Sequence, residues 1–166
     1  VVERVAGKSD LNMTCLAARV DFDKSEVLIC NAGHTFPILV HTERDGTSAK
    51  HLSDKQQPIL GYNLQSKEKH EFINARYPLR PNDLLLLYTD GLSDARNLKS
   101  KVFGRFLFRT LKQRREFTSP DTLKKDILEM FGFYTQGTVV DDDVCFLIVQ
   151  MTPLGVSSAR KDLHSA

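Results

Sequence analysis

The amino-acid sequence predicts an α+β fold in which β-sheets pack together and helices cover an outer face. Two observations carry this prediction. Up to Asp94 the chain is mainly a series of short apolar runs separated by turn residues, a pattern typical of β-strands. After Asp94 the apolar spacing changes to that of amphipathic helices, and one last apolar run then closes the domain.

Size and composition fit a single globular domain. The chain has 166 residues, of which 41% are hydrophobic and 27% charged, with a net charge of +2. No block of Lys and Arg concentrates positive charge, which argues against a nucleic-acid-binding protein; the nearest, KQRR at residues 112–115, falls at a predicted helix end and suits the helix dipole. No apolar run is long enough to cross a bilayer, and no signal-peptide pattern begins the chain.

The cysteines and the two ends of the chain lead to further expectations. Cys15, Cys30 and Cys145 lie in apolar runs without close pair spacing, so we expect buried thiols in a reducing compartment. The first residue is Val rather than Met, so we expect a piece of a longer chain. The expected organisation is an N-terminal arm at residues 1–12, a domain at 13–151 and a disordered tail at 152–166.

The first strands are predicted from apolar runs and turn signals. Residues 13–22 and 26–30 form a predicted hairpin around a turn at residues 23–25. Gly33 marks a predicted bulge or sharp bend before another strand at residues 35–40.

The middle of the chain is more polar. Asp45 and Gly46 give a strong hairpin signal. PILG at residues 58–61 is a short apolar segment closed by glycine. Residues 68–79 predict a half-exposed strand without a clear choice of the buried face.

The stretch NDLLLLYTDGLSDAR at residues 82–96 organises the chain. Its leucine run predicts a strand buried on both faces. The run ends at Asp90 and Gly91, which would place a carboxylate at the mouth of a rigid element, a position that suits Mg²⁺ or Mn²⁺. The alternative is that Asp90 only caps a strand-to-helix turn, with Gly91 at positive φ. Taken alone, the stretch favours this alternative.

Two helices and a last strand follow. Residues 102–114 have helical apolar spacing. Thr118 or Ser119 is the predicted N-cap of a second helix that ends near Gly132. Residues 138–150 close the domain with a buried strand.

An acidic triplet, Asp141, Asp142 and Asp143, directly precedes that last strand. Such a triplet is commonly a solvated turn. However, if the last strand and the leucine strand are antiparallel neighbours, the triplet and Asp90 converge at one end of the sheet. Converging carboxylates favour a site for Mg²⁺ or Mn²⁺.

Five motifs occur in an order that resembles one protein family. They are NAGH at residues 31–34, PILG at 58–61, NDLLLLYTDGLSDAR at 82–96, VFGRFLF at 102–108 and DDVCFLIV at 142–149. Together they resemble the bacterial metal-dependent serine/threonine phosphatases of the stage II sporulation protein E type, a branch of the type 2C phosphatase superfamily. The resemblance covers about residues 13–151.

The resemblance implies a fold, a reaction and site residues. The fold would be a sandwich of two antiparallel sheets flanked by helices, with a centre of two Mn²⁺ or Mg²⁺ ions that activate a water for attack on a phosphoserine or phosphothreonine. Asp90 and Asp142 match the family's metal-binding aspartates, with Asp143 beside the second. Gly91 would let the backbone approach the metal, and His34 would have a structural role.

The chain also departs from the family pattern. Asn82, Asp94 and Cys145 replace a usual glycine, glutamate and threonine. The family's first Asp-Gly element, whose aspartate bridges both metals, has no match: Asp10 is the nearest candidate and lacks the following glycine. The phosphatase-like domain is therefore expected to be incomplete at its N-terminal side and weakly active or inactive.

The first functional hypothesis is thus a cytoplasmic phosphoprotein phosphatase module in bacterial signalling. Its implied partners are a phosphorylated anti-sigma factor antagonist as substrate and an upstream sensor or receiver domain, through which the parent could be attached to a membrane; a homodimer stays open. We expect no nucleic acid and no membrane contact by this segment. The second hypothesis is a non-catalytic, pseudophosphatase-like interaction module in a sigma-factor partner switch. A purely structural sheet domain ranks last.

Overall fold

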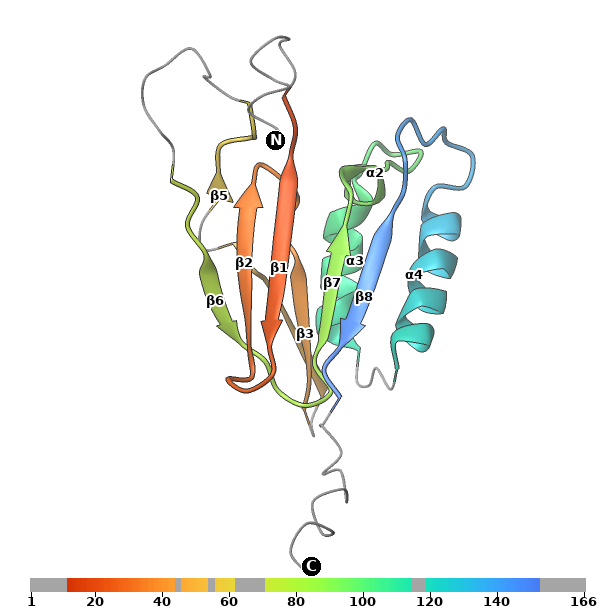
Figure 1. Cartoon of the computed structure of the whole chain (residues 1–166). Coiled ribbons are helices and arrows are strands. Elements are labelled where there is room, and N and C mark those ends of the chain that lie inside the picture. The colour runs from red at the N-terminus through yellow and green to blue at the C-terminus, as the bar shows by residue number, and fades with distance from the viewer. Residues whose placement is uncertain (1–11, 44–45, 54–55, 62–70, 115–118, 153–166) are drawn as a thin grey trace, which may run out of the picture.

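Two β-sheets stack face to face, and two helices cover the outer face of one of them (Figure 1). The computed structural model describes residues 12–43, 46–53, 56–61, 71–114 and 119–152. Both ends of the chain, including most of the expected arm and tail, lie outside the described residues. The α+β sandwich predicted from the sequence is confirmed.

The first sheet consists of β1 (Cys15–Asp21), β2 (Glu26–Ala32), β5 (Gln56–Gln57) and β6 (Ala75–Pro78). Both β5 and β6 pair with β2, and only β5 runs parallel to it. The second sheet has the order β4 (Gly46–His51), β3 (Ile38–Glu43), β7 (Leu84–Tyr88) and β8 (Phe146–Gln150), all antiparallel. The helices are α2 (Asp90–Ser93), α3 (Phe103–Gln113) and α4 (Pro120–Tyr134).

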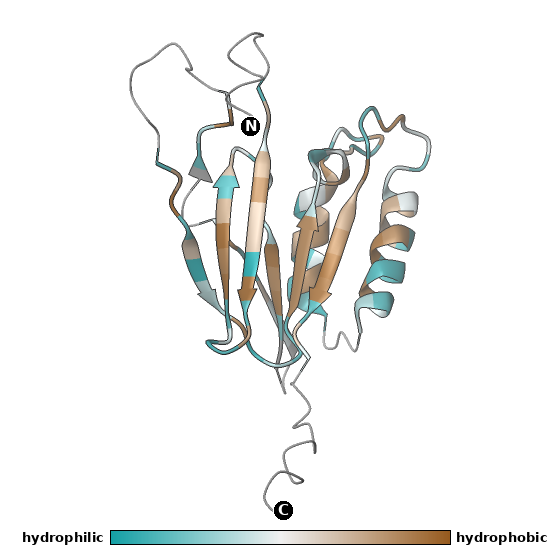
Figure 2. Ribbon diagram, viewed as in Figure 1, coloured by the Kyte–Doolittle hydropathy of each residue, from teal (hydrophilic) through white to brown (hydrophobic). Residues whose placement is uncertain are grey.

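The leucine strand β7 lies between two hydrophobic cores. Leu84 and Leu86 are fully buried in a core that includes Phe103 and Leu107 of α3. Leu85 faces the opposite way, into the core between the two sheets. Figure 2 shows β7 as an apolar strand. The prediction of a strand buried on both faces is confirmed.

The predicted first hairpin is also confirmed, since β1 and β2 pair antiparallel from Asp21 and Glu26. Gly33 has φ +69°, and a Cβ there would collide with the Cγ2 of Ile59, so the predicted bend needs a glycine. The strand predicted at residues 35–40 begins later, at Ile38. The reason is that the amide of Asn31 donates to the carbonyl oxygens of His34 and Thr35 and holds that segment in a turn.

The less certain segments are partly described. Glu43 of β3 pairs with Gly46 of β4, as the hairpin signal predicts, although Asp45 lies outside the described residues. Of the half-exposed strand predicted at residues 68–79, the part up to residue 70 is not described. The rest forms the shorter β6, in which Ala75 and Tyr77 are buried and Arg76 is exposed.

The helices agree with the predictions to within two residues. Ser119 is the N-cap of α4, and its hydroxyl accepts a hydrogen bond from the backbone of Thr122 at 3.1 Å. The helix continues past Gly132 to Tyr134. The short helix α2 begins at the strand-to-helix turn that the alternative interpretation of Asp90 included. No helix of the described residues is long and apolar enough to cross a membrane.

Two burial predictions are wrong. The three cysteines are free, but Cys145 is exposed and Cys15 and Cys30 are only half-buried. The cause is that Cys15 and Cys30 lie on the face of the first sheet opposite to Leu16, which packs in the core. The last strand, β8, is also only partly buried, because it is an edge strand of the second sheet, and the side chain of its Leu147 is 56% exposed.

Candidate active site

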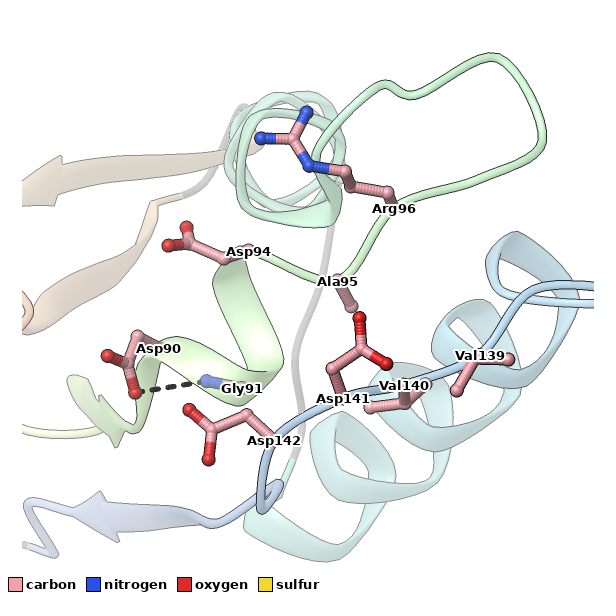
Figure 3. A pocket seen from close by; sticks show the side chains of 9 residues that line it. All are labelled: Asp90, Gly91, Asp94, Ala95, Arg96, Val139, Val140, Asp141 and Asp142. Carbon is pink, nitrogen blue, oxygen red and sulfur yellow. Dashed lines mark hydrogen bonds between the residues drawn. The ribbon is translucent and has the colours of Figure 1, made fainter.

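The ends of two neighbouring strands bring carboxylates together. β7 and β8 are antiparallel, and Tyr88 at the end of β7 pairs with Phe146 at the start of β8. Asp90 and Asp142 therefore lie at the same end of the sheet and line one pocket of about 250 Å³ (Figure 3). Asp94 and Asp141 line the same pocket. The convergence that the sequence predicted for antiparallel neighbours is thus observed.

The carboxylates of this pocket make few compensating contacts. Asp90 accepts a hydrogen bond from the backbone of Gly91 at 3.2 Å, and Asp142 accepts one from the backbone of Asp143 at 2.8 Å. Within the described part of the chain, none of the four carboxylates forms an ion pair. Like charges that line one pocket repel one another, and a bound cation relieves this repulsion. The pocket is therefore suited to bind a cation.

Thr89 joins the two strand ends. Its hydroxyl donates to the carbonyl oxygen of Asp143 at 2.9 Å and accepts from the backbone N–H of Cys145 at 3.0 Å. The backbone N–H of Thr89 donates to the carbonyl oxygen of Cys145 at 3.0 Å. These bonds hold the acidic segment, residues 141–143, close to Thr89, which directly precedes Asp90.

Gly91 lets the acidic segment approach α2. A Cβ at this position would lie 2.8 Å from the carbonyl carbon of Asp143 and 3.1 Å from the carbonyl oxygen of Asp142. Among the described residues, the glycines with positive φ are Gly33, Gly61 and Gly137. The positive φ that the alternative gave Gly91 is therefore wrong, although the strand-to-helix turn at Asp90 is present: Gly91 lies in α2, and the close packing there requires a glycine.

The NAGH segment supports the end of β7 from the other side. Asn31, 2% exposed, accepts from the backbone N–H of His34 at 2.7 Å, and Nδ1 of His34 accepts from the backbone N–H of Thr35 at 2.7 Å. The hydroxyl of Thr35 donates to the carbonyl oxygen of Tyr88. His34 thus lies in a hydrogen-bonded turn and does not line the pocket.

The site also affects a neighbouring phenol. Burial, and secondarily the negative charge of Asp94, raise the pKa of Tyr88 to about 12. Tyr88 is therefore a neutral hydroxyl at physiological pH.

The donor set fits a hard divalent cation. Carboxylate oxygens are the ligands that Mg²⁺ and Mn²⁺ prefer, and Mg²⁺ is commonly held by one or two carboxylates while it keeps several waters. No three His, Cys, Asp or Glu side chains of the described residues converge closely enough to hold a metal ion by themselves. Asp90 and Asp142 can thus supply part of a metal centre.

The structure brings together some of the expected residues and leaves others apart. Asp90, Gly91 and Asp142 line the pocket, whereas the side chains of Asp143 and His34 do not. Sequence reasoning missed the role of Thr89, although this residue directly precedes Asp90 in the stretch at residues 82–96. It also gave no role to Arg96, which lines the pocket's rim.

Comparisons with known proteins identify a family and related folds. A family model described as Stage II sporulation protein E (SpoIIE) matches residues 2–152. No curated protein matches the chain.

Solved structures share the fold. The SiaA-PP2C domain of Pseudomonas aeruginosa is 16% identical, with a TM-score of 0.64 over 87% of this chain and 54% of that one. The RsbU and RsbW domains of a Mycobacterium tuberculosis protein are 25% identical, with a TM-score of 0.62 over 84% and 37%. The Mn-presoaked phosphatase domain of SpoIIE from Bacillus subtilis is 14% identical, with a TM-score of 0.58 over 84% and 56%. The chain thus spans about half or less of the length of these structures.

Proposed function

The chain belongs to the stage II sporulation protein E family of PP2C-type serine phosphatase domains, and from this premise we propose that it is a metal-dependent phosphoserine/phosphothreonine protein phosphatase module of a bacterial signalling protein. One observation carries the proposal: Asp90, just after β7, and Asp142, just before the antiparallel neighbour β8, line one pocket. The metal would be Mn²⁺ or Mg²⁺.

The proposed roles follow from the contacts of each residue. Asp90 and Asp142 would hold metal, and the metal, when bound, would supply an activated water for attack on the phosphorus. Thr89 fixes the spacing between the two strand ends through its bonds to Asp143 and Cys145. Gly91 keeps α2 close to the acidic segment. Asp143 contributes its backbone, and His34 supports the turn beside Tyr88.

The chain alone is proposed to be weakly active or inactive. It has no match to the family's first Asp-Gly element, and its described carboxylates do not form a cluster of three ligands. The complete domain would then include residues upstream of those in this chain. The proposed substrate is a phosphorylated protein such as an anti-sigma factor antagonist, under the control of an upstream sensor or receiver domain. The proposed location is the cytoplasm.

The missing match to the first Asp-Gly element and the lack of a three-ligand cluster among the described residues support a second candidate function. This candidate is a non-catalytic module that binds a phosphoprotein in a partner switch. It keeps the fold and the acidic pocket but hydrolyses nothing.

Release of phosphate from a phosphoserine peptide, with Mn²⁺ or Mg²⁺ and with a chelator, tests the proposal. The assay compares this chain with a longer parent that contains the whole family domain. We expect metal-dependent turnover in the parent and little in the chain. Asp90→Asn and Asp142→Asn should each reduce parent turnover about a hundredfold or more, since each removes a metal ligand.

The matched control is Asp23→Asn, an exposed aspartate in the turn between β1 and β2, which should keep full turnover. Full turnover in Asp90→Asn would remove this residue from the active site. A folded parent without turnover would instead favour the non-catalytic binding module.

A further inference from the structure

A basic pocket lies next to the acidic one. It has a volume of about 730 Å³ and is lined by five cationic side chains and no carboxylate. The cations are Arg96, Lys99, Lys101, Arg105 and Arg109. A concave surface lined by charges of one sign concentrates the electrostatic field and attracts ligands of the opposite sign.

These cations differ from other basic residues of the protein. Arg76 pairs with Glu26, and Arg114 pairs with Asp126. None of the five cations of the basic pocket forms an ion pair with a described residue. All five are exposed, and among the described residues the guanidinium of Arg96 donates to one group, the carbonyl oxygen of Ser100, at 2.8 Å. Their charge is therefore available to a ligand.

The loop that presents Lys99 and Lys101 is held by hydrogen bonds from both of its sides. The side-chain oxygen of Asn97 accepts from the backbone N–H groups of Lys99 and Lys101 at 3.0 and 3.1 Å. The hydroxyl of Tyr134 on α4 donates to the carbonyl oxygens of Lys101 and Val102 at 3.1 and 3.2 Å. A loop held in this way loses little conformational entropy when it binds a ligand.

The basic pocket is continuous with the proposed active site. Arg96 lines both pockets, and Figure 3 shows its guanidinium pointing away from the carboxylates of Asp141 and Asp142. A long polyanion such as a nucleic acid would continue from the basic pocket onto Asp90, Asp94, Asp141 and Asp142 and be repelled there. A short acidic segment of a protein can fill the basic pocket and leave its phosphorylated residue at the metal-holding carboxylates.

We propose that this basic pocket is a docking site for a segment rich in Asp and Glu, next to the phosphorylated residue of the protein substrate. The proposal rests on the proposed function for the identity of the ligand, but the binding itself requires neither metal nor catalysis. Arg105 and Arg109, one turn apart on α3, would contact the acidic segment, and Arg96 would lie between it and the phosphate.

Binding of a fluorescein-labelled octaglutamate peptide to the whole chain, measured by anisotropy in the presence of a chelator, tests the proposal. We expect Arg105→Glu combined with Arg109→Glu to weaken binding about tenfold or more and to slow association, since charge at such a surface acts mainly on the association rate. The matched control, Lys124→Glu with Lys125→Glu on the exposed face of α4, changes net charge equally and should bind like the wild type.

Two further measurements separate this proposal from the proposed function. Asp90→Asn should bind the peptide at least as tightly as the wild type, because it removes a negative charge from the adjoining acidic pocket, whatever the outcome of the phosphatase assay. Failure of the wild type to bind the peptide, or equal binding by the double arginine variant with its fold retained, would overturn the docking site. Tighter binding of single-stranded DNA of the same charge through the same arginines would overturn it in favour of nucleic acid.

Discussion

The two sheets differ in how completely they are enclosed. The first sheet packs one face in the core between the sheets, and no described helix covers its other face, where Ala17 of β1 is exposed (Figure 1). The second sheet packs on both faces: Leu85 of β7 contacts the core between the sheets, while Leu84 and Leu86 contact the helices. The carboxylate Asp90 follows the more enclosed strand. The proposed chemistry is thus supported by a strand that is packed on both faces, and such packing helps to hold ligands in place.

The largest effect should come from a charge placed inside the enclosed sheet. Leu86→Asp should unfold the domain, because an unpaired buried carboxylate costs several kcal/mol against a total stability of about 5–15 kcal/mol. Ala17→Asp, on the open face of the first sheet, should cost about 1 kcal/mol or less. Urea unfolding of both variants measures the difference. A cooperatively folded Leu86→Asp variant would contradict the two-sided enclosure of β7.

The two sheets also differ in how well their burial could be predicted from the sequence. The leucine run of β7 is apolar at every position, so its two buried faces could be predicted from the sequence. In β1 and β2 the apolar residues do not reveal which face is covered, and Cys15 and Cys30 were wrongly expected to be buried. Packing partners far away in the chain decide this, and no local pattern contains them.

The site shows the same limit. Asp90 and Asp142 could be paired from the sequence because each borders an apolar strand and antiparallel neighbours align their ends. The hydrogen bonds of Thr89 to Asp143 and Cys145 depend on the register between β7 and β8, which cannot be predicted from the sequence. The basic pocket was missed because its cations are spread over residues 96–109 and gather only where a loop and a helix face come together.

The next prediction concerns close packing at the end of the second sheet where Asp90 and Asp142 lie. Gly91→Ala should cost about 1–3 kcal/mol, since its Cβ would press on the backbone of Asp143 and the segment must move. The matched control is Gly132→Ala in α4, where a Cβ meets nothing within 4 Å and helix propensity should add up to about 1 kcal/mol of stability. Thermal unfolding compares the two. Equal stabilities would show that the end of the sheet yields more readily than its interior.

A smaller effect should follow from the loss of the hydrogen bonds between the Thr89 hydroxyl and the segment that precedes β8. Thr89→Val keeps the shape but leaves the N–H of Cys145 and the carbonyl of Asp143 without their partner, at a cost of about 1–2 kcal/mol. Thr89→Ser keeps the hydroxyl and should lose less. Hydrogen exchange at the Cys145 amide gives a local measurement. If that amide is equally protected in both variants, the hydroxyl does not hold the strand ends together.

The smallest effect should appear only at alkaline pH. It compares the ionisation of Tyr88, at the end of β7, with that of a tyrosine exposed to solvent in the unfolded chain. The pKa of Tyr88 is raised to about 12 in the folded protein, from an ordinary value of 10.0 in the unfolded chain. Because the folded state keeps this proton longer, its stabilising contribution is complete below pH 10 and is lost as the pH rises toward 12. The loss near the middle of that window should be on the order of 1 kcal/mol. Urea unfolding at several alkaline pH values measures it, with Tyr88→Phe as the reference that lacks the ionising group. If both proteins lose stability equally, Tyr88 is as accessible as an unfolded tyrosine, and the enclosure of the second sheet ends before the residues that carry Asp90.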